Sequence, residues 1–114
     1  MSNNEEVSYD SGLLLRWFNR DGQDVTMLEY VLLNMRDDYR RVAETMIGGA
    51  RVSTVWTGVP RDLSALPPLI FETRVFGGAR YCERYATELG ARAGHDRAVA
   101  WVRDGMPDRE PAIG

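Results

Sequence analysis

The sequence contains no lysine, one cysteine and one histidine among its 114 residues. The lone Cys82 excludes an internal disulfide framework and any zinc site built from several cysteines, so a reducing cytoplasm is the simplest compartment. No apolar run approaches the roughly 20 residues that a membrane-spanning helix needs. The N-terminus also lacks the basic segment and apolar run of a signal peptide. We therefore expect a soluble protein that does not act at a membrane.

The charge pattern is unusual because arginine supplies all 14 basic residues. Codon usage in a GC-rich genome would explain this preference. The functional alternative is a need for planar, bidentate recognition of phosphate or carboxylate. The net charge of −3 argues against binding to duplex nucleic acid, which favours a basic excess.

The size and composition are those of one globular domain. An apolar fraction of 44% and a charged fraction of 27% are ordinary for a chain that folds around a single core. We expect a disordered, polar and acidic segment at residues 1–10, one domain at residues 11–105 and a loose tail at residues 106–114.

The first half of the chain predicts one strand and one helix. Residues 13–18 form a β-rich apolar run that the turn-forming residues 19–22 end. Thr26 and Glu29 have the spacing of a capping box, which predicts a helix that ends near Tyr39. The apolar positions of this helix recur on one side, at Leu28, Val31, Leu32 and Met35.

The second half predicts four strands and a final helix. The β-compatible segments are residues 41–47, 50–57, 69–76 and 80–85. Gly48-Gly49 and Gly77-Gly78 predict hairpin connections between neighbouring segments. Thr87 is suited to cap a helix that continues to about Arg103 and stops at Asp104-Gly105. Its apolar side comprises Ala91, Ala98, Val99 and Val102, with His95 among them.

The resulting order, β-α-β-β-β-β-α, predicts an α+β fold. We expect a twisted antiparallel sheet of about five strands with both helices on one face, because each helix has one apolar stripe. The other face then needs cover, and several aromatic residues are assigned to it. A ligand or a second copy of the chain could supply this cover, which predicts a homo-oligomer.

Three residue types could support chemistry, and each has a structural interpretation. His95 is either a packed, hydrogen-bonded histidine, paired to Glu72 or Thr73, or a catalytic base without a recognisable nucleophile. Cys82 has no second cysteine nearby and is interpreted as a small core residue. Glu72 and Glu83 either face each other as an acid–base or metal-binding pair or form ion pairs with cross-strand arginines. No phosphate-binding loop, catalytic motif or metal motif is present, and we expect no cofactor.

The strongest candidate site interleaves arginine with aromatic residues around the last hairpin. Guanidinium groups hold phosphate oxygens, and aromatic faces stack on bases. The predicted phosphate-binding residues are Arg51, Arg74, Arg80 and Arg84. The predicted stacking residues are Trp56, Phe76 and Tyr81, and Glu72 completes the set. The structural alternative is a half-solvated sheet face with its aromatic residues in the core.

A combination of short motifs carries a resemblance to a known group of proteins. The motifs are Val52-Ser53-Thr54-Val55-Trp56 with Gly58, Pro67-Pro68-Leu69-Ile70-Phe71-Glu72-Thr73, Val75-Phe76-Gly77-Gly78, Arg84-Tyr85 with Thr87, and Ala93-Gly94-His95 with Ala98-Val99. With them the chain resembles, over most of residues 13–103, a family of small accessory proteins of tailed bacteriophages, common in phages of actinobacteria. Members often continue Gly-Leu-Asp-His where this chain has Gly58-Val59-Pro60-Arg61, so a role for that acidic and imidazole pair does not carry over.

The resemblance implies a phage accessory protein in the cytoplasm of a bacterial host. Together with the arginine–aromatic cluster, it predicts a non-catalytic counter-defence protein that sequesters a nucleotide-derived immune signal. One alternative is an inhibitor that binds a host protein through its acidic N-terminal segment and Asp37-Asp38. The other is a small hydrolase that uses His95 with Glu72.

Overall fold

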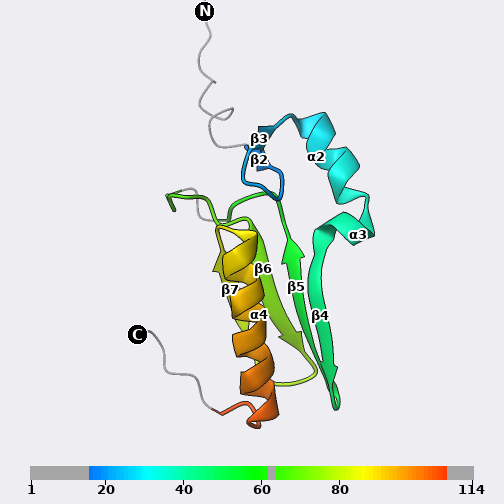
Figure 1. Cartoon of the computed structure of the whole chain (residues 1–114), viewed down its shortest axis with the longest axis vertical. Coiled ribbons are helices and arrows are strands. Elements are labelled where there is room, and N and C mark those ends of the chain that lie inside the picture. Colours follow the sequence, from blue (N-terminus) through cyan, green and yellow to red (C-terminus); the bar gives the residue numbers. More distant parts are fainter. Residues whose placement is uncertain (1–15, 62–63, 108–114) are drawn as a thin grey trace, which may run out of the picture.

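The computed structural model describes residues 16–61 and 64–107 and has the predicted α+β architecture (Figure 1). Its centre is an antiparallel sheet in the order β4-β5-β6-β7, with helix α4 across one face. The elements are β4 (Arg41–Ile47), β5 (Ala50–Trp56), β6 (Phe71–Phe76), β7 (Cys82–Tyr85) and α4 (Glu88–Arg103). The predicted disordered segment at residues 1–10, the first residues of the predicted strand at 13–18 and most of the predicted tail at 106–114 lie outside the described residues.

The β4–β5 hairpin forms as its glycines predict. Gly48 has a positive φ of 56°, a conformation that glycine adopts without steric cost. Along β5 the side chains alternate, so that Val52, Thr54 and Trp56 are buried while the residues between them are half-buried. The buried set points toward α4, and the second set points to the opposite face of the sheet.

Helix α4 also follows its sequence signals closely. The Thr87 hydroxyl accepts a hydrogen bond of 3.0 Å from the backbone N–H of Gly90 and caps the first turn. The helix ends before Gly105, which has a φ of 89°. Its buried residues are Ala91, Gly94, His95, Ala98, Val99 and Val102. This side lies on the sheet and closes most of the core.

The N-terminal elements form a separate small unit instead of a fifth strand in the sheet. β2 (Trp17–Phe18) pairs with β3 (Asp24–Val25) in a two-stranded ribbon, so the described part of the chain has a main sheet of four strands. The turn at residues 19–22 reverses the chain directly after β2, so the backbone of β2 forms hydrogen bonds with the neighbouring β3. The backbone N–H of Phe18 donates to the Gly58 carbonyl at 2.9 Å, just beyond the end of β5.

Helix α2 (Met27–Asn34) begins at the predicted capping box, but the side that it buries is opposite to the predicted apolar stripe. Tyr30 and Leu33 pack against the core, whereas the predicted apolar stripe faces solvent. The expectation that two helices cover one sheet face is therefore wrong, because only α4 does so. The helix is also shorter than predicted, since Arg36 is extended and a second short helix, α3 (Asp37–Arg40), leads into β4.

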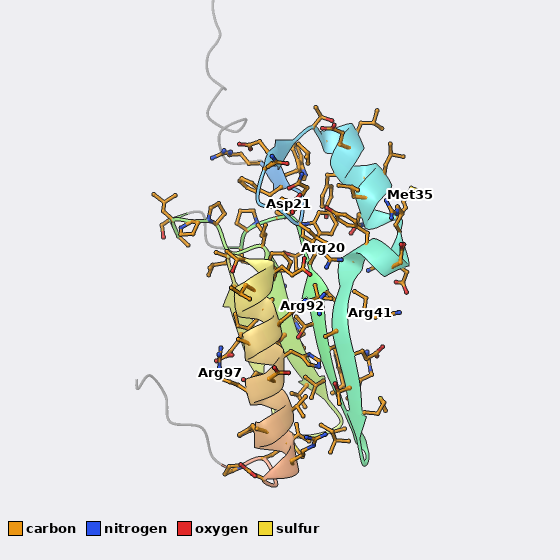
Figure 2. The ribbon with its side chains drawn as sticks, viewed as in Figure 1. Arg20, Asp21, Met35, Arg41, Arg92 and Arg97 are labelled. Carbon is orange, nitrogen blue, oxygen red and sulfur yellow. The ribbon has the colours of Figure 1, made fainter. Side chains whose placement is uncertain are left out.

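Arg20 ties this N-terminal unit to the rest of the fold (Figure 2). Its Nε donates to Glu88 Oε1 at 3.0 Å, and its Nη1 donates to the Tyr39 carbonyl at 2.9 Å. The hydrogen bond from Arg20, followed by that from Arg92, lowers the pKa of Glu88 against the opposing effect of burial. One side chain thus joins the turn after β2, helix α3 and the first turn of α4.

The C-terminal end of the described chain is held by Trp101. Its indole Nε1 donates to the Pro107 carbonyl at 2.7 Å, and the Met106 side chain packs against the core cluster under α4. The predicted loose tail therefore begins with two residues that make defined contacts. Among the described residues, no helix is long and apolar enough to cross a membrane.

Candidate anion-binding pocket

A cavity of about 420 Å³ lies beside the last hairpin, and four arginines line it. Its lining residues are Arg61, Arg74, Val75, Phe76, Arg80, Tyr81, Cys82 and Arg84. Strand alternation places Arg74 and Phe76 of β6 on the sheet face opposite α4. The β6–β7 register sets Arg74 opposite Cys82, so Cys82 and Arg84 share this face. The pocket is thus built on the face that no helix of the described chain covers.

Five of the eight predicted site residues come together here. They are Arg74, Phe76, Arg80, Tyr81 and Arg84. Their binding role stays a prediction, but their proximity follows from the register of one hairpin. Phe76 is 44% exposed and is one of the residues that line the pocket. Tyr81 contributes little exposed surface to the pocket, because it is buried and its ring packs on Trp101 with centroids 4.9 Å apart.

Glu72 does not line the pocket, but it forms ion pairs with two of the arginines that do. Its carboxylate is buried, accepts a hydrogen bond from Arg74 Nε, and lies 3.3 Å from Arg84 Nε. This hydrogen bond, followed by the negative charge of Glu72, raises the pKa of Arg74. The carboxylate therefore fixes two guanidinium groups beside the cavity and keeps Arg74 charged.

Glu72 and Glu83 do not form a carboxylate pair. Glu83 is opposite Thr73 in the register, on the face that α4 covers. There it accepts hydrogen bonds from the hydroxyls of Tyr81 (3.2 Å) and Tyr85 (2.9 Å) and lies 3.5 Å from Arg97 Nη2. The predicted ion pair with a cross-strand arginine is confirmed for Glu72, which pairs with Arg84. It is wrong for Glu83, which pairs with Arg97 of α4, and the acid–base or metal-binding pair is also wrong.

Arg61 lines the pocket but was not among the predicted residues. It comes from the long connection between β5 and β6, where the sequence has no periodicity to assign a direction to any side chain. Arg61 and Arg80 are exposed, and within the described residues neither forms an ion pair.

Two predicted residues lie outside the pocket. Arg51 is one strand away, with its guanidinium 4.5 Å from the centre of the Phe76 ring and an ion pair to Glu44 at 2.9 Å. Trp56 is 1% exposed and faces α4, and its indole N–H donates to the Phe18 carbonyl. The prediction that Trp56 stacks on a base is therefore wrong, because the ring is enclosed in the core.

Cys82 is exposed instead of buried, which corrects its interpretation as a core residue. The β7 strand is at the edge of the sheet, and the alternation directs its side chain into the pocket. There the thiol interacts with the Arg74 guanidinium. As the only cysteine in the sequence, it provides a single chemical label inside the candidate site.

His95 is a packed, hydrogen-bonded core residue, as its structural interpretation predicts, but its direct partners are Thr45 and Thr54 and not the predicted Glu72 or Thr73. Its Nε2 lies 2.8 Å from Thr45 Oγ1, its Nδ1 lies 2.8 Å from Thr54 Oγ1, and Thr54 is in turn 2.5 Å from Thr73 Oγ1. Glu72 is on the other face of the sheet, so the hydrolase pair of His95 with Glu72 does not form.

We expect His95 to make folding stability depend on pH. Burial lowers its pKa below the ordinary value of 6.5, with Arg92 adding to the effect and Asp96 opposing it. The unfolded chain therefore takes up this proton at a higher pH than the folded chain. Stability from this residue is complete above pH 6.5 and falls as the pH drops toward the lowered folded value. Urea unfolding across this range should show a weaker pH dependence in His95→Gln than in the wild type, and equal slopes would contradict the expectation.

The comparisons with known proteins give no further guide to the site. No family model, curated protein or solved structure matches this chain. Within residues 16–61 and 64–107, no group of three histidine, cysteine or acidic residues is arranged to hold a metal ion. The site must therefore be interpreted from its own geometry and charge.

Proposed function

We propose that the protein binds a phosphate-bearing, nucleotide-derived small molecule in the arginine pocket and releases it unchanged. The observation that carries the proposal is the gathering of Arg61, Arg74, Arg80 and Arg84 around one cavity. Guanidinium groups bind phosphate oxygens through paired, charge-assisted hydrogen bonds. A cavity of about 420 Å³ is within the size range of small-molecule sites.

The charge balance of the pocket favours a ligand with several negative charges. Glu72 is the carboxylate that partners Arg74 and Arg84, while Arg61 and Arg80 have no acidic partner among the described residues. Glu72 cancels one of the four positive charges, so about three remain for a ligand. A nucleotide with two or more phosphate groups supplies a matching charge, and the Phe76 ring provides an apolar face for its base.

The proposed biological role is that of a sponge, which is a protein that binds a signalling molecule and so lowers its free concentration. A phage counter-defence protein of this kind would sequester a nucleotide-derived immune signal in the host cytoplasm. This setting rests on the resemblance of residues 13–103 to phage accessory proteins. The non-catalytic part of the proposal is supported by the burial of His95 away from the pocket and by its separation from Glu72.

The alternative role, inhibition of a host protein, is weakly supported because Asp37 and Asp38, which suggested it, are paired within the chain. Asp37 pairs with Arg40 and Arg41, each at 2.5 Å, and Asp38 pairs with Arg36 at 3.3 Å. These ion pairs reduce the negative potential that Asp37-Asp38 would offer a partner. The acidic N-terminal segment lies outside the described residues.

Cys82 provides the direct test of pocket occupancy. The rate at which a thiol reagent labels Cys82 should be measured with linear and cyclic nucleotides and ADP-ribose derivatives, alongside calorimetric binding. We expect a bound ligand to slow labelling, to bind more tightly as its phosphate count rises, and to be recovered with unchanged mass. A ligand recovered in altered form would overturn the non-catalytic proposal, and no protection by any compound would overturn the ligand-binding proposal.

A charge-reversal pair makes the same test specific to the pocket. Arg80→Glu should weaken ligand binding by about 10- to 100-fold, because it removes a charge-assisted contact and adds a repulsive charge. Arg103→Glu is the matched control, since it makes the same charge change at an exposed site in the last turn of α4. An equal loss in both variants would indicate nonspecific electrostatic attraction and would contradict the pocket.

A further inference from the structure

Helix α2 exposes an apolar stripe that the other described residues of the chain leave uncovered. Its members and their exposed fractions are Met27 (58%), Leu28 (65%), Val31 (42%), Leu32 (56%) and Met35 (75%). Figure 2 shows Met35 at the outer edge of the molecule. A contiguous group of this kind is unusual on a soluble monomer and commonly marks an interaction surface.

The orientation of α2 is fixed by contacts on its other side. The Tyr30 ring packs on Trp56 with centroids 5.7 Å apart, and Leu33 packs against the same core cluster. Turning the stripe inward would remove these contacts. The capping box of Thr26 and Glu29 also holds the first turn in place. The stripe is therefore presented by a fixed helix.

We propose that this stripe is a self-association surface, on which α2 of a second copy packs antiparallel across a twofold axis. Residues 28, 31, 32 and 35 have the spacing i, i+3, i+4, i+7, which is symmetric about the midpoint between Val31 and Leu32. A twofold axis at that midpoint sets Leu28 against the partner's Met35 and Val31 against the partner's Leu32. The same surface thus meets itself, as a twofold interface requires.

The helix dipoles weakly favour the antiparallel arrangement, because antiparallel dipoles attract each other and parallel dipoles repel. Arg36, which directly follows the C-cap of α2, does not continue the helix: its backbone is extended and its guanidinium pairs with Asp38 of the same chain.

The area of the stripe predicts a weak dimer. Each of the five side chains can bury on the order of 100 Å² of apolar surface, so two copies together would bury roughly 1,000 Å². This value is at the lower end for specific interfaces, and we expect a dissociation constant on the order of 1–100 µM. α3 leads from α2 into β4, at the sheet edge opposite β7. Self-association at α2 therefore leaves the arginine pocket accessible, and the inference is independent of the proposed function.

Sedimentation velocity over a range of concentrations around this dissociation constant tests the proposal. We expect the wild-type chain to change from monomer to dimer, and Leu28→Glu and Met35→Glu to stay monomeric at concentrations at least tenfold higher. Leu89→Glu is the matched control, because Leu89 is 81% exposed on α4 and away from the stripe. A wild-type chain that stays monomeric throughout would overturn the proposal.

Cysteine cross-linking in a Cys82→Ser background tests the geometry. Val31→Cys should form a disulfide-linked dimer, because residue 31 is next to the twofold axis. Leu28→Cys alone should not, since the two copies of residue 28 would be about 10 Å apart along the helix axes, beyond disulfide reach. An equal mixture of Leu28→Cys and Met35→Cys chains should cross-link. Cross-linking of Leu28→Cys alone, or none with Val31→Cys, would overturn the antiparallel pair.

Discussion

Replacing Trp56 with alanine is expected to lower the free energy of unfolding by about 4 kcal/mol. Trp56 is 1% exposed and belongs to the core cluster that joins the sheet, α4 and the N-terminal elements. The Tyr39 ring meets it edge-on at 5.0 Å between centroids, and Tyr30 packs on it at 5.7 Å. The indole N–H donates to the Phe18 carbonyl at 3.0 Å. The substitution therefore creates a cavity and leaves a buried carbonyl without its donor.

Urea unfolding, followed by circular dichroism, measures this loss, with Trp17→Ala as the control. Trp17 is half-buried and contacts Tyr30 at 6.5 Å between ring centroids, so its removal should cost less than half as much. Hydrogen exchange should show that β2, β3 and α2 open first in Trp56→Ala, because this ring is their main contact with the sheet. A loss no larger than that of Trp17→Ala would contradict the central role of Trp56.

Local signals in the sequence were sufficient for most of the secondary structure. The Gly48-Gly49 loop, the Thr87 cap and the apolar side of α4 each depend on residues close together in the chain, and each prediction is confirmed. Alternation along β5 places Val52, Thr54 and Trp56 on one face, and the structure buries that face. What alternation does not provide is the identity of the element that covers a face. Trp56 was therefore assigned to a ligand when α4 and the N-terminal unit enclose it.

The orientation of α2 shows the same limit in a helix. Periodicity correctly grouped Leu28, Val31, Leu32 and Met35 on one side. It does not determine which side is buried, and here the larger Tyr30 ring and Leu33 occupy the core. Periodicity alone favours placing the stripe on the sheet, because a soluble monomer normally buries such a surface.

The pocket was predictable only where one hairpin builds it. Arg74, Phe76 and Arg84 are brought together by the β6–β7 register, which the short connection between two adjacent strands largely determines. Arg61 enters from a long irregular connection, and its position depends on tertiary packing. The exposure of Cys82 depends on β7 being an edge strand, which the order of the segments alone does not establish.

Replacing Gly94 with alanine is expected to destabilise the protein by about 2–3 kcal/mol. In an ordinary helix the same change stabilises by up to about 1 kcal/mol, so the expected sign is opposite to that of helix propensity. Gly94 is buried on the side of α4 that faces Tyr85. A Cβ at this position would overlap the Tyr85 ring and hydroxyl. This contact gives a physical reason for glycine in the Ala93-Gly94-His95 motif.

Tyr85 has little freedom to move away from an added methyl group. It is 9% exposed, its hydroxyl donates to Glu83, and its carbonyl accepts a hydrogen bond of 2.9 Å from the Ile70 N–H. Burial, more than any other cause, raises the pKa of this hydroxyl, which therefore stays protonated as a donor. The strain should instead displace α4 outward and lengthen the 2.8 Å contacts that His95 makes with Thr45 and Thr54.

A double-mutant cycle with Tyr85→Leu separates this steric effect from other causes. Leucine lacks the ring atoms and hydroxyl that would meet the new Cβ, so Gly94→Ala should cost at least 1 kcal/mol less in that background. Gly49→Ala is the control, because nothing lies within 4 Å of a Cβ there and its effect should be within about 0.5 kcal/mol. Additive effects of Gly94→Ala and Tyr85→Leu would show that the cost does not arise from their contact. A coupled pair would establish that Tyr85 determines how closely α4 approaches the sheet and so positions His95 within its hydroxyl network.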